Sequence, residues 1–118
     1  MSLLTSDGAT LRAFADAVLR EAAETLDEVV PVTLAVIGGV LAEAEPGSVA
    51  VQGADHGPVL LWATFAGRRM VFRYNVMTAM IELREDTPEG YPLRLFGHRS
   101  LTMDVVNFFG TLRREGRL

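Results

Sequence analysis

Two histidines carry the side chains best suited to acid–base or ligand chemistry in this 118-residue sequence, and each stands beside a charged neighbour. His56 follows Asp55 in the segment 53–57, where a carboxylate next to an imidazole could form half of an acid–base pair. The same segment is rich in turn-forming residues, and turn formation explains the Asp and Gly there without any chemistry. We therefore assign no catalytic residue to this pair.

The second histidine belongs to the sequence His98-Arg99-Ser100, directly before the last predicted helix. Free amide groups at a helix start attract anions, and an imidazole with a guanidinium beside them could complete a site for a small phosphate or carboxylate. The simpler interpretation is a Ser100 cap with two solvated side chains. For a ligand site in a cleft between the sheet and this helix, Tyr74 and His56 are the further polar groups that we consider.

No established catalytic, cofactor or metal motif occurs in the chain. The glycines form neither G-x-G-x-x-G nor a P-loop, and the histidines and acids form neither H-E-x-x-H nor an EF-hand loop. The serines lack the context of a nucleophile elbow. The chain contains no cysteine, so neither a disulfide nor a thiolate metal site can form. The sequence thus predicts no cofactor and no metal ligand, and it favours a protein without enzymatic activity.

A short basic and aromatic segment offers a test for nucleic-acid binding. Arg69 and Arg73 alternate with Phe72 and Tyr74 on a predicted strand, so stacking side chains and phosphate-binding side chains would lie on opposite faces. The isoelectric point is about 5.1 and the chain has no lysine. We therefore do not expect nucleic acid as the partner.

The N-terminal third has the spacing of helices. Between about residues 8 and 29, apolar residues recur at steps of three and four on one face. Ser6 or Asp7 can cap the start of this helix, and Pro31 ends or kinks it. The segment 32–45 fits either a buried helix, because it is apolar nearly all round, or a hairpin around its two glycines. Its closing Ala and Glu residues favour the helix.

The rest of the chain alternates as strands do, apart from one ambiguous segment and a C-terminal helix over about 101–114. The segment 75–85 fits either a helix, which we prefer, or a bent strand. The resulting fold class is α+β, with a three- to four-stranded antiparallel sheet, a meander, packed with N-terminal helices and a C-terminal helix. The predicted strands are 48–52, 59–65, 69–74 and 93–96.

The composition indicates one domain, 1–118, with more apolar surface than a small core hides. Hydrophobic residues make up 49% of the chain and the mean hydropathy is +0.24, which excludes a disordered chain. The strand 59–65 is apolar on both faces, so its second face needs a cover. A second copy of the chain is the simplest one, and we expect a homodimer. The candidate interface or apolar groove consists of Leu60, Trp62, Met77, Met80, Phe108 and Phe109.

The charges are unevenly placed along the chain. Residues 1–67 contain two Arg and nine acids, whereas residues 68–118 contain nine Arg and six acids. This pattern leaves three functions open. The leading one is a non-enzymatic interaction protein that acts as a homodimer. The second is a small-ligand protein or minor enzyme with an anion-accepting cleft near the start of the last helix. The third is an acidic adaptor or inhibitor of a basic partner.

The placement of charged and apolar residues also indicates where in the cell the protein is expected. The longest uncharged stretch, 29–42, is shorter than the roughly 20 apolar residues of a membrane span. The first twenty residues carry acids and arginines rather than the pattern of a secretory signal. We therefore expect a cytoplasmic protein without membrane contact.

Overall fold

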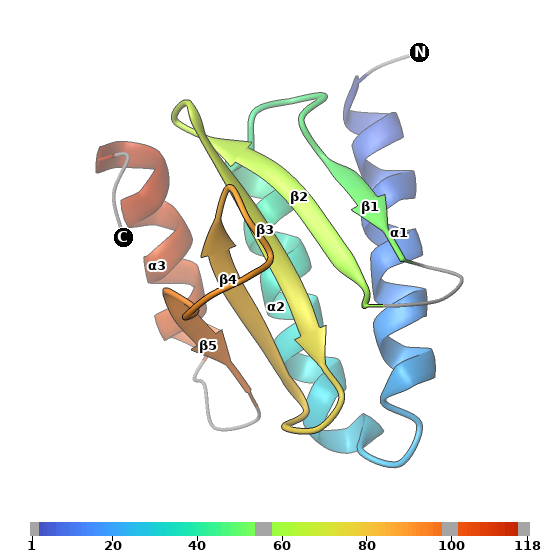
Figure 1. Ribbon diagram of the computed structural model, residues 1–118. Helices are drawn as coiled ribbons and strands as arrows, with labels where there is room; N and C mark the ends of the chain where they lie inside the picture. The colour runs from blue at the N-terminus through green and yellow to red at the C-terminus, as the bar shows by residue number, and fades with distance from the viewer. Residues whose placement is uncertain (1–2, 54–57, 98–101, 116–118) are drawn as a thin grey trace.

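The computed structural model describes residues 3–53, 58–97 and 102–115. Within these residues three helices lie on one face of a five-stranded antiparallel sheet, which confirms the α+β class (Figure 1). The strand order is β1-β2-β3-β4-β5, so each strand pairs with its neighbour in sequence, as in the predicted meander. The elements are α1 Leu3–Glu21, α2 Leu26–Glu43, β1 Ala50–Gln52, β2 Leu60–Phe65, β3 Arg68–Asn75, β4 Met80–Glu85, β5 Arg94–Phe96 and α3 Thr102–Glu115.

The sheet has five strands rather than three or four because the segment 75–85 is not a helix. Ile81 and Leu83 of β4 are buried on the helix side, so the segment alternates with a period of two. Asn75 opens the connecting turn by accepting the Met77 N–H on its side chain (2.9 Å). The preference for a helix was wrong because β4 satisfies its backbone groups by pairing with β3 and β5.

The expected single helix over residues 8–29 is two helices. α1 already begins at Leu3 and ends at Glu21, and α2 begins at Leu26. Between them the chain turns, and the Thr25 N–H donates to the Ala22 carbonyl (2.8 Å). Pro31 lies inside α2 rather than at a helix end, which costs that helix one intrahelical hydrogen bond.

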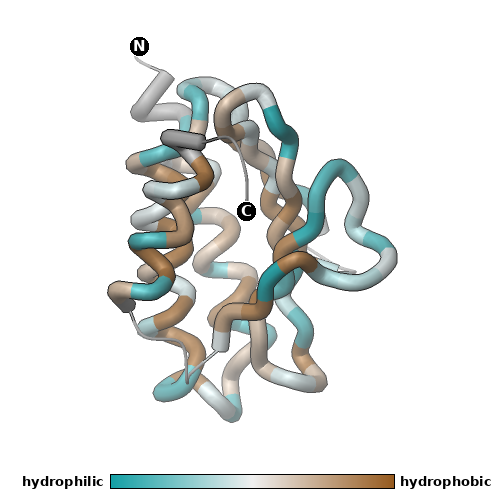
Figure 2. Tube along the Cα trace, turned by 90° about the vertical axis from the view of Figure 1, so that its left-hand side faces the viewer, coloured by the Kyte–Doolittle hydropathy of each residue, from teal (hydrophilic) through white to brown (hydrophobic). Residues whose placement is uncertain are grey.

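The core lies between the sheet and the helix layer, as Figure 2 shows in the view along the layers. Phe72 of β3 stacks on Phe109 of α3 with a centroid distance of 5.9 Å. Gly39 of α2 lies against the same ring, because a Cβ placed there would be 2.2 Å from Phe109 Cδ2. A glycine thus permits the close approach of α2 and α3. Six residues of β2 and β3 face the helices: Leu61, Ala63, Phe65, Met70, Phe72 and Tyr74.

A corner at residues 45–48 joins the helix layer to the sheet. The Glu45 N–H donates to the Thr64 carbonyl (2.8 Å), and the Glu45 carboxylate accepts the Gly67 N–H (2.7 Å). The Gly47 N–H donates to Asp7 of α1 (2.9 Å). Asp7 therefore does not cap α1, as the sequence suggested, because the helix starts before it and its carboxylate is a tertiary acceptor.

Candidate functional site

Most of the predicted ligand-site residues lie outside the described part of the chain. His56, His98, Arg99 and Ser100 belong to the segments 54–57 and 98–101, which the structure does not describe. Tyr74 is the one member of the set whose position is given. The predicted convergence of these residues on one cleft therefore stays a prediction.

Tyr74 is buried on the helix side of β3, with 5% of its surface exposed. Its hydroxyl forms no hydrogen bond of regular geometry with the described residues. The pKa of Tyr74 is raised above its ordinary value, mainly by burial. The negative charge of the Glu21 carboxylate adds to this rise, and the Thr25 side chain opposes it. The phenol is thus a core group close to the junction of α1 and α2 rather than an exposed proton donor.

An open hollow of about 460 Å³ lies beside Tyr74, between the end of α1 and the β3–β4 turn. The Asn75 side chain at its wall is already engaged, because its amide donates to Glu82 (3.0 Å) and its oxygen accepts the Met77 N–H. The charged side chains at the wall have opposite signs. The lining residues are Glu21, Pro58, Val59, Arg73, Tyr74, Asn75, Val76 and Met77. Such a mixed lining does not select one class of ligand.

The predicted interface residues do not share one surface. Phe109 is in the core, and Phe108 packs half-buried against Phe96 at a centroid distance of 5.6 Å. Met77 is 89% exposed in the β3–β4 turn. The other members, Leu60, Trp62 and Met80, lie on the sheet face that turns away from the helices.

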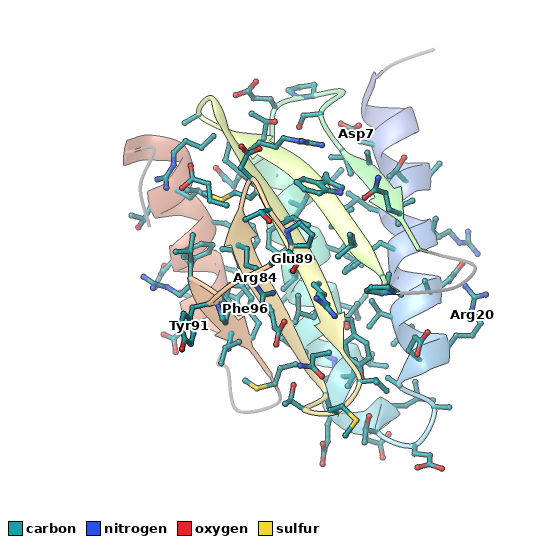
Figure 3. The ribbon with its side chains drawn as sticks, viewed as in Figure 1. Asp7, Arg20, Arg84, Glu89, Tyr91 and Phe96 are labelled. Atoms are coloured by element: carbon teal, nitrogen blue, oxygen red, sulfur yellow. The ribbon has the colours of Figure 1, made fainter. Side chains whose placement is uncertain are left out.

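On the sheet face away from the helices, Trp62 is covered by side chains of neighbouring strands. Trp62 is buried there although no helix packs on it, because the Arg69 guanidinium lies 3.9 Å above its ring and its Nε1–H donates to Gln52 (2.9 Å). The β4–β5 loop crosses the same face (Figure 1). Arg84 fixes this loop by donating to the Gly90 carbonyl (2.8 Å); Figure 3 labels Arg84 and the loop residues Glu89 and Tyr91.

A half-buried acid completes this network. Glu82 accepts hydrogen bonds from Arg84 (2.9 Å) and Asn75 (3.0 Å). Burial alone would raise the pKa of Glu82, but the two hydrogen bonds and the attraction of Arg84 and Arg73 outweigh it and lower the pKa. The carboxylate is therefore held in its charged form as part of the sheet.

The arginines of β3 contact β4 and the β4–β5 loop rather than forming a basic surface. Arg68 pairs with Glu85 through two hydrogen bonds (2.6 and 2.9 Å), and Arg69 lies 3.9 Å from Asp86. The Arg73 guanidinium reaches the Pro88 carbonyl at 3.5 Å. This pairing leaves the face with alternating charges, which is unlike the continuous basic track of a nucleic-acid site.

The apolar surface that the sequence interpretation missed lies on α2. Pro31, Leu34, Gly38 and Leu41 recur at steps of three and four, and we call these four residues the α2 outer face. Leu34 is 60% exposed and Leu41 is 46% exposed. The expectation of a buried helix was wrong for this side of α2. The opposite side, with Val29, Val32, Val36 and Val40, packs on the core. The uncharged stretch 29–42 was the signal for this surface, because it places apolar residues on more sides of the helix than the one that packs on the core.

The described residues form neither a metal-binding cluster nor a membrane-spanning helix. Among the described residues, no group of three or more His, Asp or Glu side chains is placed to hold a metal ion. Within the same part of the chain, no helix combines the length and the apolar character that crossing a membrane requires.

Most of the chain matches a known protein family. A search of curated proteins finds no similar sequence. Residues 8–103 match the family described as "Integron cassette protein VCH_CASS1 chain". The matched segment includes most of α1 and all of α2 and the five strands. Because this match covers more than half of the 118 residues, the chain belongs to the family of the integron cassette protein VCH_CASS1 chain.

Proposed function

We propose that this protein is a small non-enzymatic binding protein that recognises another polypeptide through the α2 outer face. The proposal rests on one observation: an α-helix at the centre of the helix layer carries no charged residue from 29 to 42, yet its outer side is exposed. A helix that is apolar all round is normally covered on all sides. The uncovered side is therefore the surface best suited to a partner.

Other exposed apolar residues of the helix layer support this choice. Met103 and Val106 of α3 are 64% and 51% exposed, and α3 packs beside α2 (Figure 1). The sheet face is a weaker candidate, since Trp62 and Val71 are covered within the chain itself. Burial of leucine and methionine side chains against a partner supplies the main driving force for association.

The homodimer expected from the sequence is one form of this proposal and stays a prediction, as does the cytoplasmic location. In such a homodimer, two copies would bury Leu34 and Leu41 against each other across a two-fold axis. The interface would then be on the helix layer rather than at the predicted set that includes Leu60 and Trp62.

Light scattering coupled to size-exclusion chromatography tests self-association directly. We expect the wild-type mass to rise toward that of a dimer at high micromolar concentration if a second copy binds, and the double variant Leu34→Ser/Leu41→Ser to remain a monomer. Val76→Ser, in the β3–β4 turn, removes a side chain of similar exposure (56%) away from α2 and serves as the control. A strict wild-type monomer removes the homodimer from the proposal.

A further inference from the structure

We propose that the occupant of the α2 outer face is an amphipathic helix of another protein, with Arg or Lys residues at the margins of its apolar stripe. This inference rests on the proposed function, because it names the partner for the same surface. The steps of three, four and three between Pro31, Leu34, Gly38 and Leu41 match the seam of a helix pair. A second helix is therefore the element whose side chains fit this spacing.

The charge around the surface favours a basic partner over a second copy. No cation occurs between Arg20 and Arg68, and this interval contains the whole of α2. α2 has Asp27 and Glu28 in its first turn and ends at Glu43. Two copies joined through α2 would bring these acidic ends toward an equally acidic layer, whereas Arg or Lys margins would be attracted to both ends.

The carboxyl end of α2 is the position where a cation would gain most. The end of a helix carries a partial negative charge, which a basic residue in the last turn usually offsets. α2 has no basic residue in its last turn and ends at Glu43, so the helix dipole and the carboxylate have the same sign. A cation supplied by a partner at this end would interact favourably with the helix dipole.

Gly38 gives the surface its shape. It is exposed near the middle of α2, and a Cβ placed there would meet no atom within 4 Å. Glycine is less favourable than alanine inside a helix, and nothing within the described chain requires it at this position. Without a Cβ the surface is lower between Leu34 and Leu41, so a large side chain of a partner helix can insert there as a knob into a hole.

Three synthetic peptides of 18 residues, the length of α2, test the inference. The first has a leucine seam with Arg margins, the second has the same seam with Glu margins, and the third is a scrambled version of the first with the same composition. Fluorescence anisotropy of labelled peptide measures binding at low and high salt. We expect the basic amphipathic peptide to bind at least about tenfold more tightly than the other two, and added salt to weaken it.

Protein variants locate the binding surface. Leu34→Ser/Leu41→Ser should weaken the basic peptide at least about tenfold, the effect of losing anchor side chains. Gly38→Ala should weaken it several-fold while raising the thermal unfolding temperature, so lost binding cannot be attributed to lost folding. The control Val76→Ser should leave binding unchanged.

Each other outcome overturns the inference in a distinguishable way. Equal binding of the basic and acidic peptides, both dependent on Leu34, removes the basic partner and leaves the proposed function standing. A Leu34-dependent dimer that binds none of the peptides identifies a second copy as the occupant. If Leu34→Ser/Leu41→Ser changes neither peptide binding nor self-association, the inference and the proposed function both fail.

Discussion

At the scale of single residues, Glu82 shows how a half-buried charge is held in place. Its side chain is 13% exposed and it accepts hydrogen bonds from Arg84 and Asn75. Because the pKa of Glu82 in the fold lies below its ordinary value of 4.5, the charged form stabilises the folded state. This contribution is complete above the ordinary pKa and is lost as the pH falls through the lower pKa of the folded protein.

Glu82→Gln should therefore lower the free energy of unfolding by about 1–2 kcal/mol at about pH 7, since hydrogen bonds to a charged acceptor become bonds to a neutral one. The difference between wild type and variant should shrink as the pH falls below 4.5 and through the lower pKa of the folded protein. Urea unfolding followed by circular dichroism across this range measures it. The pKa of Glu85 is also lowered, by its hydrogen bonds from Arg68, but this contribution cancels in the comparison. A difference that stays constant with pH would contradict the prediction.

At the scale of elements, two neighbouring glycines of α2 have different surroundings, which the spacing of apolar residues alone does not predict. A Cβ on Gly38 would meet no atom within 4 Å, whereas a Cβ on Gly39 would lie 2.2 Å from the buried ring of Phe109. Gly38→Ala should raise the free energy of unfolding by about 1 kcal/mol through helix propensity. Gly39→Ala should lower it by about 1–3 kcal/mol through overpacking. Chemical denaturation of both variants measures these changes. If both variants shift the free energy of unfolding in the same direction, the packing of α2 on α3 is refuted.

The elements that sequence reasoning predicted well are those whose pattern has one solution. The alternation in β2 and β3 predicted the strands and which side chains face the core, since Leu61 and Phe72 cannot be buried in another register. The segment 75–85 had two solutions, because Ile81 and Leu83 fit a helical stripe as well as a strand. Pairing with β3 and β5 favours the strand over the helix, and such non-local contacts cannot be predicted from the local sequence.

The candidate site was less predictable for two reasons. His56 and His98 lie outside the described residues, so their expected roles stay predictions. The interface set that included Trp62 relied on a strand face with no visible cover, and the cover comes from Arg69 and Gln52 on neighbouring strands. The exposed stripe of α2 depends on which side of the helix meets the core. That choice follows from tertiary packing rather than from the run of apolar residues.

At the scale of the whole molecule, the two layers differ in how their charges are used. In the sheet layer, Arg68, Arg69 and Arg84 each pair with an acid of β4 or of the residue directly after it. Five of the seven acids between Arg20 and Arg68 belong to α1, α2 and the turn between them. The uneven charge along the chain thus becomes an acidic helix side and a sheet side with paired charges, so a basic partner would be directed to the helices.

The corner at residues 45–48 connects these layers, and Asp7 is its contact with α1. Asp7 is buried and its carboxylate accepts the Gly47 N–H at 2.9 Å, across forty residues of chain. Asp7→Ala leaves this N–H without its partner, so the free energy of unfolding should fall by about 1–3 kcal/mol. Asp7→Asn keeps an acceptor and should lose less. Asp16→Ala, at an exposed position of the same helix, should change stability by less than about 0.5 kcal/mol.

Hydrogen exchange separates loss of this contact from general weakening of the fold. In Asp7→Ala the Gly47 amide should exchange faster than the overall stability change requires, because the bond that protects it is gone. The Thr64 amide, which donates to the Ser48 hydroxyl (3.0 Å) on the sheet side of the corner, should change only with the overall stability. If Asp7→Ala and Asp16→Ala behave alike in both measurements, the hydrogen bond between Asp7 and Gly47 contributes nothing measurable to stability.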